Sequence, residues 1–284
     1  SESQLFIKLI FLYFYLKFSV FLMSLKVSAS VLIFCALAVN TFQEEKLLNQ
    51  TDSQGRKQGH WIKKYTNGKI MYEGFFRDDH PAGEFKRYYE NEVLKSILVF
   101  SSDGTEAEAV LYYPNGYKAS EGRYSRQQKN GKWRFFSAVT EGLLISEEEY
   151  KNDKINGWQI KYYPDSVIAE KQHYSAGIKD GDWIKYHPSG SMHFKTTYEN
   201  GRLNGKFEAF FENGTTEVLG QYKNNRKEGT WIIYDKNGNI KFKTEYISGM
   251  PKNRDIDLYE THYIDSLENL KVRIEDPEKT GAKW

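Results

Sequence analysis

The sequence predicts an all-β fold, built as an elongated single-layer antiparallel meander of about eight β-hairpin repeats. Three observations support this prediction. Aromatic residues make up 16% of the 284 residues, and 21 Tyr and 18 Phe stand against 6 Pro, a composition that favours pleated strands. Glycine returns at a fixed interval along the chain, and aromatic residues return at fixed distances from it. A fixed interval of this size is the signature of a repeat protein.

The repeat interval is set by glycines. It is a 24-residue period, and only the step that ends at Gly157 is two positions longer. Ala107 stands in the one place where the glycine is missing. We take these positions as the starts of eight units: Gly59, Gly83, Ala107, Gly131, Gly157, Gly181, Gly205 and Gly229.

Two rows of aromatic residues keep the same interval and are expected to form the core of the repeat. Two residues after the unit start, six of the eight units carry a large ring: Trp61, Phe85, Trp133, Trp183, Phe207 and Trp231. The exceptions are Ala109 and Gln159. Every unit also closes on an aromatic residue: Phe76, Phe100, Tyr124, Tyr150, Tyr174, Tyr198, Tyr222 and Tyr246.

Each unit is predicted to form one β-hairpin. Asn-Gly pairs, which favour two-residue turns because both positions take positive φ, lie in mid-unit at residues 67–68, 115–116, 213–214 and 237–238. A second set is expected to separate one unit from the next: Asn130-Gly131, Asn156-Gly157, Asp180-Gly181 and Asn204-Gly205. This pairing places Trp61 opposite Gly74 and Phe207 opposite Gly220, so that a missing side chain makes room for a ring.

A single unit is not expected to fold alone. Three buried rings stabilise it by roughly 2 kcal/mol each, whereas ordering its backbone costs about 1–2 kcal/mol per residue. Stacked units share ladder hydrogen bonds and ring contacts, which gives the nearest-neighbour stability of a repeat array.

A third aromatic row is the candidate binding surface. It lies five residues after the unit start in seven units: Tyr88, Tyr112, Phe136, Tyr162, Tyr186, Phe210 and Tyr234. Because alternate residues of a strand point to opposite faces, we expect this row on the face opposite Trp61, among charged neighbours such as Glu73. Two interpretations remain open: a ladder of rings for an extended peptide, glycan or helix, and a thin second core covered by lysine stems.

The segments YENGRLNGKF (198–207), YKNDKINGWQ (150–159) and YSAGIKDGDW (174–183) resemble the MORN repeat, whose units start near Tyr-x-Gly and continue through x-x-Gly-x-Gly. The order Gly-x-Trp-x-x-x-Tyr-x-x-Asn-Gly and the 24-residue period are more similar to the bacterial MORN-variant family, often labelled as toxin–antitoxin antitoxins. The resemblance covers about residues 55–252. It implies a non-catalytic β-sheet interaction module, used for scaffolding, membrane contact or toxin neutralisation.

The sequence departs from the MORN-variant pattern in three places. Ala107 and Ala109 replace the glycine and the ring of the third unit, the segment SAVTEG begins at Ser137, and Gln159 replaces the ring of the fifth unit. At these places we expect bends or weak joints in the sheet.

No catalytic, cofactor or metal site is predicted. The six histidines are dispersed, and the pair His187 and His193 lacks the spacing typical of a zinc site. The sequence contains no Gly-x-Ser-x-Gly, Walker loop or His-Glu-x-x-His pattern. We therefore expect a protein that is not an enzyme and binds no cofactor.

The charge pattern limits the partners. A formal net charge of +2 predicts no strong attraction to nucleic acid. Basic residues nevertheless recur just before the unit starts: Arg56, Lys57, Lys129, Lys154, Lys179, Arg202, Arg226 and Lys227. They are interpreted as charges that keep turns soluble and edges unpaired; the alternative is a track for an acidic polymer or lipid head groups.

Both ends of the chain lack the period. Residues 1–22 are an apolar segment or an upstream extension. Residues 23–43 combine a basic start at Lys26, an apolar run and an Ala-Leu-Ala sequence at 36–38, the layout of a secretory signal peptide. A linker (44–57), the repeat domain (58–252) and an acidic tail (253–284) follow, and the tail is expected to cap the last hairpin. The only cysteine, Cys35, precludes a disulfide within the chain.

Two functions follow from these observations. The first is an exported, non-catalytic repeat protein, periplasmic, in the cell envelope or secreted, that binds a protein or other macromolecule along its sheet. The alternative is an antitoxin-like regulator that is cytoplasmic, or is anchored to a membrane by both apolar stretches. The oligomeric state is left open.

The signal-peptide layout predicts that the mature protein begins between about Val39 and Glu45, because a signal peptidase cleaves after a small-residue site such as Ala36-Leu37-Ala38. N-terminal sequencing of the native protein checks this. Recovery of a chain that still carries residues before Val39 from a soluble cytoplasmic fraction would contradict it.

Overall fold

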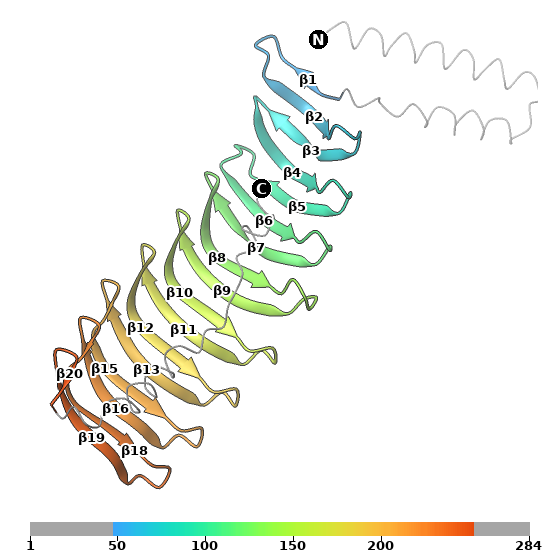
Figure 1. The fold of residues 1–284 in the computed structure, drawn as a ribbon. Helices are drawn as coiled ribbons and strands as arrows, with labels where there is room; N and C mark the ends of the chain where they lie inside the picture. Colours follow the sequence, from blue (N-terminus) through green and yellow to red (C-terminus); the bar gives the residue numbers. More distant parts are fainter. Residues whose placement is uncertain (1–47, 253–284) are drawn as a thin grey trace, which may run out of the picture. The chain divides into compact units, whose positions relative to one another are not determined.

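A computed structural model describes residues 48–252 of the chain, and these form one antiparallel β-sheet in which each strand pairs with its neighbours in the sequence (Figure 1). The expectations for the upstream segment (1–22), the signal peptide (23–43) and the tail (253–284) fall outside the described residues. Of the expected linker (44–57), the described part contributes a short strand to the sheet. Within residues 48–252 no helix is long and apolar enough to cross a membrane.

The sheet contains twenty strands. The strands are β1 (Gln50–Thr51), β2 (Lys57–Lys64), β3 (Ile70–Arg77), β4 (His80–Tyr88), β5 (Leu94–Phe100), β6 (Glu106–Tyr112), β7 (Lys118–Ser125), β8 (Gln128–Phe136), β9 (Leu144–Lys151), β10 (Lys154–Tyr162), β11 (Ile168–Ser175), β12 (Ile178–Tyr186), β13 (Met192–Glu199), β14 (Arg202–Leu203), β15 (Gly205–Phe210), β16 (Thr216–Lys223), β17 (Arg226–Lys227), β18 (Gly229–Tyr234), β19 (Ile240–Ile247) and β20 (Met250–Pro251). A bulge divides β14 from β15 and β17 from β18, so the units from β2 to β19 are eight hairpins.

The predicted fold class and strand pairing are confirmed. The sheet is an all-β antiparallel meander, and Trp61 lies opposite Gly74 while Phe207 lies opposite Gly220. The chain reverses at each turn as the repeat period requires, because each unit supplies two strands and two connections.

The turns between units are not where the sequence predicted them. The pairs that end in Gly131, Gly157, Gly181 and Gly205 lie within strands or at bulges. The two-residue turns lie four residues earlier, where both residues have positive φ: Asp78-Asp79, Arg126-Gln127, Asn152-Asp153, Ala176-Gly177, Asn200-Gly201, Asn224-Asn225 and Ser248-Gly249. This geometry is the primed hairpin turn that matches strand twist, built here largely from Asn and Asp.

The mid-unit turns also differ from the prediction. In the first unit Gly68 N donates to Tyr65 O at 3.0 Å, and Tyr65 N donates to Lys69 O at 2.8 Å. Gly68 has a φ of 84°, but Asn67 has no positive φ; its side-chain oxygen instead accepts a hydrogen bond from Lys69 N at 3.0 Å. The connection is therefore a three-residue loop with a left-handed glycine, and the asparagine acts through its side chain.

The glycines at the unit starts form β-bulges. The partners of β3 jump from Phe85 to Ala82 across Gly83 and Glu84, and Gly83 has a φ of 67°. A bulge of this kind favours glycine because one of the extra residues takes positive φ. The glycine period of the sequence is therefore a bulge period, and the predicted turn position was wrong because both features favour the same residue.

The third unit shows what replaces the bulge when glycine is missing. Ala107 pairs regularly with Phe100, without a register shift between β5 and β6. The preceding turn is longer instead: Ser101 N donates to Glu106 O, and Gly104 takes a φ of 70°. The two extra residues thus move from the strand into the turn, and the repeat period is kept.

Three of the large rings pack over a glycine of the preceding unit. A Cβ atom added to Gly74 would lie 2.2 Å from the ring of Phe85, and one added to Gly220 would lie 2.2 Å from the ring of Trp231. In the same way, a Cβ atom added to Gly122 would lie 2.4 Å from the ring of Trp133. Neighbouring units therefore interlock through a ring on one strand and an absent side chain on the next.

Where the ring is missing, the facing position changes with it. Ala109 pairs with Leu98, which is 1% exposed, so a large residue on β5 fills the space that the small residue on β6 leaves. Gln159 pairs with Glu148, and its Nε2 donates to the Glu148 carboxylate at 2.7 Å. The ladder is continuous at these places, because β5–β6, β8–β9 and β9–β10 are all paired, so any weak joint there is not a break in strand pairing.

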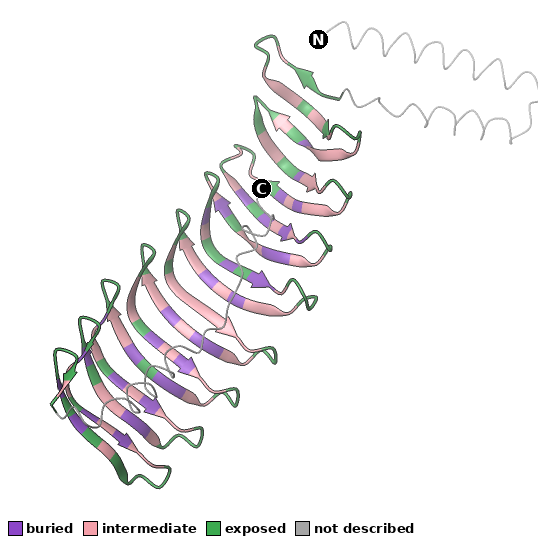
Figure 2. Ribbon diagram, in the orientation of Figure 1, coloured by how far each residue is buried: buried purple, intermediate pink, exposed green. Residues whose placement is uncertain are grey.

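Within residues 48–252 the core consists of two large aromatic clusters and a small third one around Tyr113 and Ala119. One large cluster extends from Phe85 to Phe135, and the other from Trp183 to Tyr246. Between them lie the buried polar side chains Glu148, Glu170 and Gln172. Figure 2 shows that buried residues gather in the middle of the strands, whereas the turns at both margins are exposed.

A further row, which sequence reasoning missed, ties five of the units to the unit that follows. Its side chains lie six residues after the unit start and donate to a carbonyl in the following unit. Tyr65 Oη donates to Tyr88 O at 2.7 Å, for example, just beyond a register shift in β4. We name this the clasp row, and it consists of Tyr65, Tyr89, Tyr113, Tyr163 and His187.

The interlock between units predicts strong coupling between Gly122 and Trp133. Gly122→Leu alone should overpack the site at a cost of at least about 1–3 kcal/mol, and Trp133→Ala alone should cost about 3–5 kcal/mol through the cavity it leaves. The double variant recreates the Leu98–Ala109 pair, so it should be more stable than the sum of the single losses predicts. Urea unfolding of the four proteins measures the coupling. Strictly additive losses would contradict the interlock.

Candidate functional site

The two faces of the sheet have different chemistry. We name the face that carries Trp61, Trp133, Trp183 and Trp231 the tryptophan face. The other face carries ion pairs such as Lys86–Glu84 at 2.7 Å and Lys195–Glu208 at 2.9 Å, and we name it the charged face.

The third aromatic row lies on the charged face. Each member directly follows a register shift in its strand: Tyr88, Tyr112, Phe136, Tyr162, Tyr186, Phe210 and Tyr234. The backbone carbonyls of five members accept a clasp, which gives these positions a structural role in addition to any binding role. All are partly buried except Phe136, which is 8% exposed.

Two tyrosines of this row are held by carboxylates. Tyr88 Oη donates to Glu73 at 2.6 Å, and Tyr162 Oη donates to Glu147 at 3.2 Å. Burial, together with the hydrogen bond to Glu73, raises the pKa of Tyr88 to about 12. These hydroxyls therefore remain protonated at neutral pH and orient the rings against the sheet.

Phe136 is buried, so the third aromatic row is not a continuous accessible surface. The ammonium group of Lys118 lies 5.0 Å from the centre of its ring, in the range of a cation–π contact. At this position the arrangement matches the covered-core interpretation, whereas the half-exposed tyrosines fit either interpretation.

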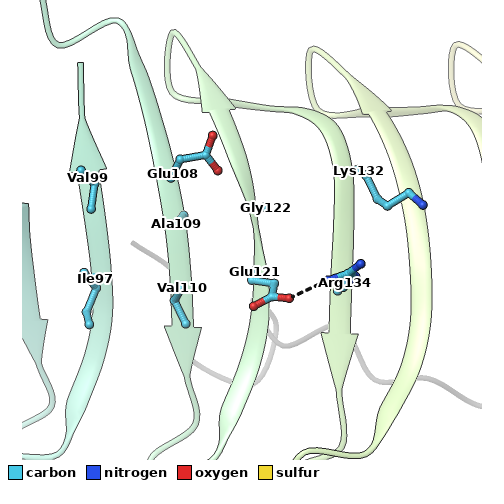
Figure 3. A pocket seen from close by; sticks show the side chains of 9 residues that line it. All are labelled: Ile97, Val99, Glu108, Ala109, Val110, Glu121, Gly122, Lys132 and Arg134. Atoms are coloured by element: carbon cyan, nitrogen blue, oxygen red, sulfur yellow. Dashed lines mark hydrogen bonds and ion pairs between the residues drawn. The ribbon is translucent and has the colours of Figure 1, made fainter. Parts of the chain in front are cut away.

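A shallow hollow opens on the charged face beside this row (Figure 3). Ile97 and Val99 on β5 and Val110 on β6 give it an apolar wall, and Val99 is 49% exposed. Its volume is about 370 Å³, and the remaining lining residues are Glu108, Ala109, Glu121, Gly122, Lys132 and Arg134. The hollow lies at the third unit, the one that departs most from the repeat pattern.

An ion row borders the hollow. Arg134 contacts Glu121 at 3.3 Å and Glu147 at 3.0 Å, and Lys132 lies 3.5 Å from Glu147. Burial alone would raise the pKa of Glu147, but Arg134, Lys132 and Tyr162 outweigh it and hold that pKa below the usual glutamate range. The row stays ionised at neutral pH and presents charges of both signs beside apolar side chains.

The sequence contains a signal for this hollow at an outward-facing position of the repeat. Ile97 stands one repeat period after Glu73 and one repeat period before Glu121. An apolar residue therefore replaces a carboxylate at an outward-facing position of the repeat. A comparison of outward positions between units, rather than of core positions, identifies this place.

The family of the chain follows from its repeats. A model of the MORN repeat variant matches residues 57–78, 82–101, 179–200, 203–224 and 227–248. The chain belongs to the MORN repeat variant family. The matched segments are five of the eight units, and the unmatched ones are the third, fourth and fifth MORN units, where Ala107, the SAVTEG loop and Gln159 depart from the pattern.

The other comparisons add little to this family assignment. No curated protein matches the sequence. Among solved structures, the Tc holotoxin pore of Photorhabdus luminescens is similar over 70% of this chain, with 13% sequence identity and a TM-score of 0.17. This chain spans 12% of the length of that chain.

Four of the lysines predicted to line a sheet edge lie elsewhere. In the first, fourth, sixth and eighth MORN units the lysine before the unit start lies over rings of the tryptophan face. Lys129, for example, lies 5.0 Å from the rings of Trp133 and Tyr150. An acidic polymer or lipid partner stays a prediction, whereas the interpretation as turn charges therefore does not hold for this set: Lys57, Lys129, Lys179 and Lys227.

The histidine pair of the sixth MORN unit is a packing contact. The rings of His187 and His193 lie 4.3 Å apart, and His187 Nε2 donates to Phe210 O at 3.0 Å. Burial, with His187 and Lys185 nearby, lowers the pKa of His193 to about 4. No group of three or more potential metal ligands occurs within residues 48–252.

The two interpretations of the third aromatic row can be separated with a matched pair of variants. We expect Tyr162→Ser with Tyr186→Ser to lower the free energy of unfolding only modestly, because both rings lie outside the two aromatic clusters. Tyr174→Ser with Tyr198→Ser changes the same residue type in the same two MORN units, on the tryptophan face, and should cost more. Thermal and urea unfolding compare the two. Equal losses would assign the row to a second core.

Proposed function

We propose that this protein is a non-catalytic scaffold that binds another protein through the charged face, at the hollow of the third MORN unit. The observation that carries the proposal is the apolar wall of Ile97, Val99 and Val110 on a face otherwise rich in ion pairs. An exposed apolar patch with a charged rim is the usual form of a protein-binding centre.

The surroundings of the hollow favour a protein partner. Its apolar side chains come from adjacent strands of a continuous ladder, so a ligand would meet a preformed surface and little ordering would be needed. Glu108 has a side chain that is 71% exposed, and the side chain of Lys132 is 55% exposed. These two groups offer opposite charges beside the apolar wall, which provides orientation as well as contact area.

The repeat architecture also supports a scaffold. MORN units have their largest side chains in contacts between units, and the polar groups described above are engaged in clasps, caps and ion pairs. Export by the segment at residues 23–43 is part of the same proposal. It places the binding face outside the cytoplasm, where the fold needs no disulfide because its units interlock.

The hollow is tested by a charge placed on its wall. Val99→Lys should weaken partner binding at least tenfold, because it buries an ammonium group against apolar surface, and it should leave the fold intact because Val99 is half exposed. Val139→Lys is the matched control, since Val139 is 87% exposed and lies in the SAVTEG loop. The partner is captured from the envelope or secreted fraction with the full-length protein, identified by mass spectrometry, and its affinity for each purified variant is measured. Equal binding by the two variants would reject the hollow as the site.

A further inference from the structure

The tryptophan face carries an excess of cationic side chains over its rings. Six of them lie within 6.0 Å of an aromatic centre on this face: Lys57, Arg87, Lys129, Lys179, Lys185 and Lys227. Two carboxylates, Glu148 and Glu170, share the face, and both have partners within it: Gln159 for Glu148, and Lys161 and Trp183 for Glu170. The face is therefore positively charged along most of its length.

Several of these cations are almost inaccessible. Lys129 is 5% exposed, Lys185 is 6% exposed and Lys227 is 8% exposed. Within residues 48–252 the sheet is one layer thick, with no helix or second sheet over this face. A single layer leaves the outer side of each lysine facing away from the strands. An acidic chain laid along this face would give these cations a complementary cover.

The C-terminal segment has the charge and the length to supply that cover. Residues 253–284 contain eight acidic residues against five basic ones. The segment continues from Lys252, directly after β20 at the last MORN unit. In extended form its 32 residues reach about 100 Å, whereas sixteen strands at about 4.8 Å span about 75 Å. It can therefore reach back along the sheet from Lys227 to Lys129.

We propose that residues 253–284 bind along the tryptophan face of the same chain, with their carboxylates over the row formed by Lys129, Lys179 and Lys227. Carboxylates over this row relieve the repulsion among cations held near rings, and the apolar side chains of the segment meet the aromatic surface between them. The segment thereby acts as a lengthwise strap over several MORN units rather than as a cap on the last hairpin. The tryptophan face is then occupied, and the charged face is the one left for a partner.

Zero-length crosslinking of the full-length protein tests this proposal. A carbodiimide joins a lysine to a carboxylate only where the two are in contact, and peptide mass spectrometry identifies the links. We expect links from Lys129, Lys179 and Lys227 to acidic residues between Asp255 and Glu278. The Lys195–Glu208 pair on the charged face, at 2.9 Å, is the internal positive control. Formation of this control link without any link from the three lysines to the segment would overturn the proposal.

Two further measurements distinguish the possible occupants of the tryptophan face. Mixing isotope-labelled and unlabelled protein distinguishes links within one chain from links between chains, and links found only between chains would assign the face to a second copy. A full-length variant with the eight acidic residues of the segment changed to Asn or Gln should lose the three links at least tenfold, while the Lys195–Glu208 link persists. A matched variant with Lys271, Lys279 and Lys283 changed to Gln should keep them. Loss of links in both variants alike would show that charge does not hold the segment.

Discussion

The packing of a ring from one unit over a glycine of the unit before it is the contact on which the sheet depends. Phe85 over Gly74, Trp133 over Gly122 and Trp231 over Gly220 bring adjacent strands so close that an added Cβ atom would overlap a ring. This contact belongs to two units at once, which explains why a single hairpin is not a stable object. It also explains why the departures come in pairs, since Leu98 faces Ala109 and Glu148 faces Gln159.

The fold could be predicted from the sequence because a regular repeat interval can be recognised without knowing the conformation of each residue. The eight units, the hairpin pairing of Trp61 with Gly74 and the separation of the two faces all follow from the repeat period and from strand alternation. The position of the turns could not be predicted in this way. Glycine with positive φ serves both a turn and a bulge, so Gly83 and Gly131 identify a backbone conformation without saying which of the two adopts it.

The side chains that could not be predicted are those whose partners strand alternation does not identify. Alternation puts Tyr65 on the face of Trp61 and Lys129 on the face of Trp133, but it does not say what either side chain contacts. In the sheet, Tyr65 donates a hydrogen bond to a carbonyl of the next unit, and Lys129 lies over aromatic rings of its own unit. The hollow of Ile97 and Val99 could not be predicted from the repeat pattern, since it arises from a change at an outward position, whereas inward positions carry the pattern.

The middle of the sheet has a mechanical consequence. Ser137 stands where other units carry a clasp residue, and its hydroxyl accepts hydrogen bonds from Val139 N and Thr140 N within its own loop. The same region contains the polar side chains that separate the two aromatic clusters. Under a pulling force applied to the two ends of the sheet, the ladder between the fourth and fifth units carries the load without a clasp or a continuous ring stack. The sheet would part there into two halves, each of which keeps its own aromatic cluster.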